Sequence, residues 1–153
     1  MVNNTPAATA TTSTPSRTPG IGRVLVVVYA ILALAAVGRS VFQIIDRFGE
    51  APIAFSLSAL SGLVYVVATV ALVARGAAWY RIALVTISFE LVGVIVVGTI
   101  TTFAPWIIGL ADNDPFGRTS TVWSSYGLGY LMIPLVLPVL GLLYLRRRRP
   151  SAV

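Results

Sequence analysis

Four long apolar runs fill almost the whole of this 153-residue chain and leave only short connections between them. A helix needs about 20 mostly apolar residues to cross about 30 Å of hydrocarbon. In lipid, backbone polar groups must be bonded within their own segment, which favours helices over open strands. The sequence therefore predicts an all-α fold, a bundle of four transmembrane helices at about 21–45, 52–74, 78–103 and 126–145. Together they form one domain, 21–149.

Composition agrees with a membrane location. Hydrophobic residues make up 57% of the chain and charged residues 10%, whereas a soluble domain carries about 25% charge. Residues 1–20 are mostly Thr, Ala, Pro and Ser, which predicts a disordered cytoplasmic tail; residues 150–153 form a second, short tail. The start of the first run imitates a cleavable secretion signal. However, apolar residues resume after Arg39, which favours an uncleaved span.

The arginines predict the orientation. Unbalanced arginines lie in the N-terminal tail, around Arg75 and Arg81, and at the C-terminus, whereas the other two connections are slightly acidic. The positive-inside rule then places both termini in the cytoplasm of a cell with a multi-pass protein in its plasma (inner) membrane. Trp79 is predicted at the inner interface, and Trp106, Trp123 and Tyr126 at the outer one.

A block of four arginines follows the last apolar run directly. A net charge of +6 raises the question of nucleic acid, but a basic block beside a span is typical of an anchor on anionic lipid head groups. We therefore predict a lipid bilayer, and no nucleic acid, as the partner of this block. Its members are Arg146, Arg147, Arg148 and Arg149.

Three polar side chains lie inside the predicted spans. Glu90 stands near the bilayer midplane, where a lone carboxylate is expected to be neutral, paired or exposed to a wet cavity. Arg39 and Gln43 lie four residues apart in the first span. Arg39 has two predicted alternatives: it reaches Glu90, or it extends to the outer interface and pairs with Asp46. The pattern favours a structural role for these groups over a proton or cation carrier.

Small residues predict close helix packing. Ala54, Ser58 and Gly62 are spaced by four in the second span, a ladder that lets another helix approach, either a neighbouring span or a second protomer. Gly93 lies about one turn from Glu90 and continues its face. Two prolines in the fourth span, Pro134 and Pro138, each remove a helical hydrogen bond. They predict a bent helix, with a hinge as the alternative.

Residue types argue against catalysis. The chain has no Cys, His or Lys, so it offers no thiolate ligand and no familiar base to activate a hydroxyl. We predict no catalytic, cofactor-binding or metal-binding residues. The third connection, about 104–125, contains Asp112 and Asp114. Their oxygens would suit a hard cation, but the pattern is more typical of a turn before proline.

The segments GRSVFQI, ISFELVGV and TVWSSYGLGYLMIPLVLPVLGLLYLRRRR resemble small four-span integral membrane proteins of actinobacteria over about residues 21–149. The resemblance implies a four-helix inner-membrane protein and no activity.

Three functional hypotheses follow. The first is a non-catalytic plasma-membrane protein that acts as an accessory subunit or a small homo-oligomer. The second is a small proton- or cation-coupled transporter using Glu90. The third is an outer-face sensor or ligand binder using the connection 104–125.

Overall fold

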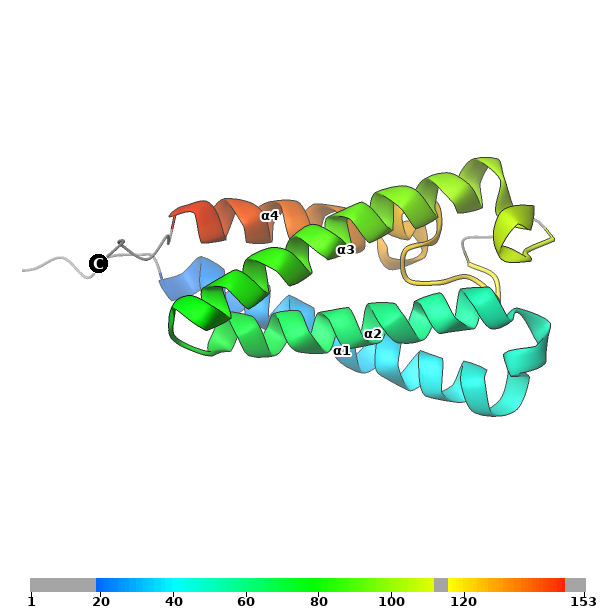
Figure 1. Ribbon diagram of the computed structural model, residues 1–153, viewed down its shortest axis with the longest axis horizontal. Coiled ribbons are helices and arrows are strands. Elements are labelled where there is room, and N and C mark those ends of the chain that lie inside the picture. Colours follow the sequence, from blue (N-terminus) through cyan, green and yellow to red (C-terminus); the bar gives the residue numbers. More distant parts are fainter. Residues whose placement is uncertain (1–18, 112–115, 148–153) are drawn as a thin grey trace, which may run out of the picture.

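The computed structural model describes residues 19–111 and 116–147. Every regular element in this part of the chain is helical, which confirms the all-α class. The long helices are α1 (Pro19–Arg47), α2 (Pro52–Val73), α3 (Ala77–Phe103) and the shorter α4 (Ile133–Arg147) (Figure 1). Short 3₁₀ helices are η1 (Phe48–Glu50), η2 (Pro105–Ile108) and η3 (Ser124–Tyr130).

Within the described residues, three helices are long and apolar enough to cross a membrane, and there is a fourth span if η3 and α4 are counted as one bent span. The chain is therefore a multi-pass membrane protein. Pro52 begins α2, a position where its missing N–H has no helical partner to lose. Gly76 lies just before α3 with φ of 118°, a conformation that favours glycine in this tight turn.

The long helices lie side by side along one axis (Figure 1). We call the end that holds the start of α1 and the end of α4 the terminal end. The opposite end, where α1 passes into η1 and α3 into η2, is the loop end. The main apolar core lies between all four helices and includes Leu32, Ala68, Ile87 and Leu137. A smaller cluster at the loop end packs Phe55 against Ile108.

The prediction of one helix over 126–145 is wrong. The chain is bent by 99° between η3 and α4, and α4 begins only at Ile133. Its 15 residues span about 22 Å, less than the hydrocarbon thickness. The cause is a compact turn in which the Met132 amide donates to the Gly127 carbonyl at 2.9 Å. Gly127 has φ of 81° and lies against the Pro134 ring, so close that a Cβ would be 2.7 Å from Pro134 Cδ.

The space beside this short helix is filled by the chain that precedes it. We call residues 116–130 the return segment. In Figure 1 it lies between α3 and α2 in the half of the bundle towards the loop end. Its centre is buried, and Trp123 is only 1% exposed. The connection that the sequence placed outside the lipid therefore folds back among the helices.

Irregular backbone at membrane depth is tolerated only where it is buried in protein and its polar groups are bonded. Hydroxyl groups meet this need here. The Thr121 amide donates to Ser124 Oγ at 2.9 Å, and the Trp123 amide donates to Thr121 Oγ1 at 3.1 Å. The Ser125 amide donates to Thr101 Oγ1 of α3 at 2.8 Å. Ser and Thr hydroxyls of the segment, together with Thr101 of α3, thus accept hydrogen bonds from the backbone amides of the segment.

Candidate functional site

The intramembrane carboxylate, Glu90, is fully buried in α3. The Tyr29 hydroxyl of α1 donates to Glu90 Oε2 at 2.8 Å, and Tyr29 is itself fully buried. The second carboxylate oxygen, Oε1, is buried and makes no hydrogen bond within the described residues. The carboxyl group therefore joins α3 to α1 through one neutral donor, and no cation contacts it in this part of the chain.

A second buried hydrogen bond lies beside the first. Trp123 Nε1 of the return segment donates to the Tyr65 hydroxyl of α2 at 3.2 Å. The Tyr29 and Tyr65 rings are 6.2 Å apart at 52°, within the range of favourable aromatic pairs. We call Tyr29, Tyr65, Glu90 and Trp123 the central cluster. It connects α1, α2, α3 and the return segment at the middle of the bundle.

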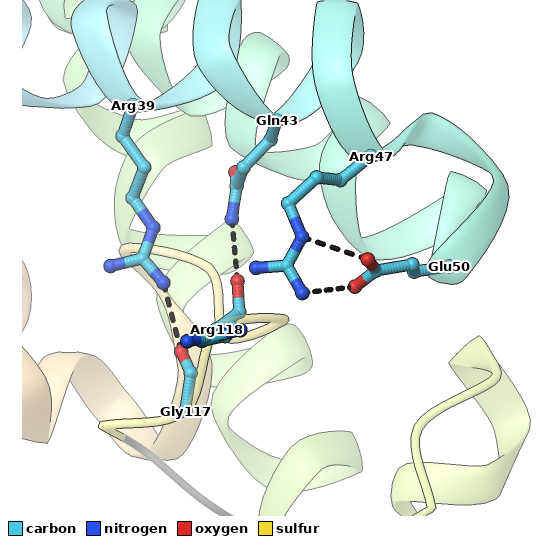
Figure 2. A network of polar contacts seen from close by, with 6 residues as sticks. All are labelled: Arg39, Gln43, Arg47, Glu50, Gly117 and Arg118. Atoms are coloured by element: carbon cyan, nitrogen blue, oxygen red, sulfur yellow. Dashed lines mark hydrogen bonds and ion pairs between the residues drawn. The ribbon is translucent and has the colours of Figure 1, made fainter.

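Arg39 reaches neither Glu90 nor Asp46. Its guanidinium extends to the return segment, where Nη2 donates to the carbonyls of Gly117 at 2.9 Å and Ser120 at 3.0 Å (Figure 2). Both alternatives predicted for its partner are therefore wrong. The reason is that the return segment, which the sequence placed outside the lipid, lies beside α1 and presents backbone carbonyl groups to Arg39.

Gln43 lies one turn further along the same face of α1 and also bonds the return segment. It is 3% exposed, and its amide nitrogen donates to the Arg118 carbonyl at 3.0 Å. One more turn along, Arg47 binds Glu50 through two hydrogen bonds of 2.8 and 2.6 Å. Figure 2 shows these side chains in a row facing the return segment. We call Arg39, Gln43 and Arg47 the arginine face.

The predicted ladder on α2 packs inside the monomer. Ala54 and Ser58 are buried, and a Cβ on Gly62 would lie 3.2 Å from the Val37 amide nitrogen. At Gly62 the ladder therefore accommodates α1, the neighbouring-span alternative. Gly93 makes a similar close contact with a different partner, because a Cβ there would lie 2.9 Å from the Trp123 ring. Its partner is the return segment, which periodicity alone did not indicate.

The aromatic positions were predicted only in part. Trp106 is 70% exposed at the loop end, as an interfacial residue would be. Trp123 is buried in the central cluster, and the Tyr126 ring lies against Gly98 of α3. The prediction of an outer-interface position is wrong for Trp123, because the segment that carries it turns back into the bundle.

The remaining candidates lie near α4 or outside the description. Pro134 is in the first turn of α4 and Pro138 in its interior, and both are buried; a hinge there stays a prediction. Arg146 and Arg147 end α4, whereas Arg148 and Arg149 lie outside the described residues. The same holds for Asp112 and Asp114, and for most of the predicted tail. Among the described residues, no group of three acidic side chains could hold a metal ion.

The sequence analysis missed two residues of the central cluster. Tyr29 and Tyr65 stand in the runs VVVYAIL and LVYVVA, where a hydroxyl at membrane depth needs a partner. This requirement, together with the presence of Glu90 at a similar depth, could have predicted a hydrogen bond between a tyrosine and Glu90.

Comparison of the chain with protein-family models, curated proteins and solved structures finds no match. The resemblance to small actinobacterial membrane proteins therefore stays a prediction.

Proposed function

We propose that the protein is a non-catalytic plasma-membrane protein that works as a subunit, either in a small homo-oligomer or beside a different membrane protein. The observation that carries this proposal is a pair of apolar grooves flanking α4. One, of about 440 Å³, lies between α3 and α4 and is lined by residues such as Leu84, Leu91 and Leu142. The other, of about 270 Å³, lies between α1 and α4 and includes Val24 and Leu140.

The side of α4 between these grooves is also apolar and half-exposed, with Val136, Val139, Leu140 and Leu143 each between 43% and 51% exposed. Lipid tails are as apolar as these residues, so packing of a helix there depends on shape. A groove on each side of a short helix offers that shape to a partner helix. The sealed central cluster supports a structural role for the polar groups inside.

Cross-linking tests the proposal cleanly, because the chain has no cysteine of its own. A single cysteine at Leu143, which lines both grooves, is expected to cross-link in native membranes. Val85 on α3 is 68% exposed and lines neither groove, which makes it a matched control. Equal yields at both positions, together with recovery of a lone monomer in mild detergent, would remove the subunit proposal.

The orientation is part of the same proposal. With both termini in the cytoplasm, a cysteine at Phe116, which is 73% exposed at the loop end, is labelled by an impermeant maleimide from outside intact cells. A cysteine in the N-terminal tail is labelled only after the membrane is opened. The reverse pattern would invert the topology.

A second candidate, a proton- or cation-coupled transporter, is favoured by one observation. Glu90 leaves one oxygen without a partner in the described residues, and the neighbouring fourth span is broken, a feature that transporter sites share. Flux in proteoliposomes should then fall in Glu90→Gln. Equal flux in wild type and variant would exclude this candidate.

A further inference from the structure

A pocket of about 690 Å³ opens at the loop end between α1 and the return segment. The arginine face forms one wall, with Arg39, Gln43 and Arg47 one turn apart. Phe116 and Arg118 belong to the opposite wall. Figure 2 shows the guanidinium of Arg39 and that of Arg47 both directed towards the return segment.

Among the described residues that line this pocket, positive charges outnumber negative ones. They include three guanidinium groups and one carboxylate, that of Glu50. Glu50 is engaged by Nε and Nη2 of Arg47. Among the described residues, Arg39 bonds only neutral oxygens and pairs with no carboxylate. The Arg118 guanidinium is exposed and makes no hydrogen bond or ion pair with the described residues.

Hydrogen bonds from α1 to the backbone of the return segment hold this pocket in shape. Gln43 is nearly fully buried, and its side-chain amide donates to the backbone carbonyl of Arg118, which fixes the backbone there. Arg39 fixes the backbone at Gly117 and Ser120 through Nη2. Its Nη1 makes a weak hydrogen bond to the Tyr130 hydroxyl, because the two atoms are 3.5 Å apart. In Figure 2 the remaining amino group of Arg47 points away from Glu50. Arg47 and Arg118 therefore keep donor capacity for a ligand. Arg39 keeps it at Nη1 alone, because its Nε is buried and its Nη2 is already bonded.

We propose that this pocket binds a phosphate group, coordinated by Arg118 with Arg39 and Arg47. Guanidinium groups bind phosphate through paired, charge-assisted hydrogen bonds. The excess of positive charge among the described lining residues suits a phosphate better than a neutral solute. The surroundings suit a phosphate near hydrocarbon. Phe42, which lines the pocket, is 56% exposed, and nearby Ile45 is 74% exposed at the end of a spanning helix.

The phosphate has two sources, an outer-leaflet phospholipid or a soluble phosphate, and the test separates them. The full chain, purified in dodecyl maltoside, is titrated with inorganic phosphate and with short-chain phosphatidylglycerol. Chloride at matched ionic strength supplies the baseline, and thermal unfolding is the readout. Arg118→Gln is the key variant, because its exposed side chain changes while its carbonyl remains for Gln43. Arg81→Gln, at the terminal end, is the matched control.

Wild type and Arg81→Gln are expected to be stabilised by one or both probes, and Arg118→Gln to bind about tenfold more weakly. Stabilisation by inorganic phosphate assigns a soluble ligand, and stabilisation by phosphatidylglycerol alone assigns the lipid. Arg47→Gln, in which Glu50 loses its partner, should weaken binding as well. A wild-type response no larger than that to chloride would overturn the proposal. So would an affinity of Arg118→Gln within roughly threefold of wild type.

Discussion

The central cluster and the arginine face are both polar, yet they meet their surroundings in opposite ways. Glu90, Tyr29, Tyr65 and Trp123 are each at most 1% exposed and bond one another. The arginine face lines an open pocket and bonds mostly backbone carbonyls and a surface carboxylate. The difference teaches that a buried charge-bearing residue in a membrane bundle need not mark the functional surface. Here the open pocket lies at the loop end, and the buried carboxylate of Glu90 joins α3 to α1.

The largest expected effect concerns the residue that seals the central cluster. Trp123→Ala removes a buried ring from between α2 and α3 and leaves the Tyr65 hydroxyl without its donor. It should lower the free energy of unfolding in micelles by about 3–5 kcal/mol. Trp106→Ala is the matched control, since Trp106 is 70% exposed and its loss should have little effect. Equal destabilisation by the two changes would contradict the burial of the return segment.

The next largest effect is expected from loss of the Tyr29–Glu90 hydrogen bond in the central cluster. Tyr29→Phe keeps the ring and removes the only donor to Glu90 in the described structure, at a cost of about 1–3 kcal/mol of unfolding free energy. In Glu90→Leu the tyrosine loses its acceptor at similar cost. The double variant should cost less than the sum of the two, because both single changes break the same bond. Additive effects in unfolding titrations would show that the two residues are not coupled.

Packing of α1 on α2 gives the next effect. Gly62→Ala places a Cβ 3.2 Å from the Val37 amide nitrogen, so the helix backbones must separate, at about 1–3 kcal/mol. Gly38→Ala is the control, because nothing lies within 4 Å of its Cβ position and alanine favours helix. Thermal unfolding should rank Gly38→Ala at or above wild type and Gly62→Ala below it. The opposite order would mean that α1 and α2 do not meet at Gly62.

The smallest effect on stability is expected from a change at the arginine face. The Arg47–Glu50 ion pair is partly exposed, with Glu50 46% accessible, and such pairs contribute about 0–1 kcal/mol. Glu50→Gln should therefore change the unfolding free energy by less than that amount, and high salt should reduce the difference further. A loss comparable to that of Tyr29→Phe would place Glu50 among the structural groups and break the distinction between edge and centre.

Much of this fold was accessible from the sequence. The length of the apolar runs predicted α1, α2 and α3, and the small-residue spacing predicted the tight α2 surface at Gly62. The 99° bend in the fourth apolar segment was not predicted, because the number of apolar residues does not reveal a turn that depends on Gly127 packing against Pro134. The central cluster was missed for a related reason: the partners of Glu90 and Tyr65 depend on which segments are neighbours, and the return segment was assigned to water.

The central claim is that the return segment folds into the bundle and buries Trp123 there. The fluorescence of Trp123 tests this claim directly. Replacing Trp79 and Trp106 by Phe leaves Trp123 as the only tryptophan of the chain. In reconstituted vesicles, its emission should be blue-shifted and resist quenching by both aqueous iodide and brominated lipid, because protein surrounds it. Red-shifted emission that iodide quenches would place Trp123 at the membrane surface and contradict the inward fold of residues 116–130.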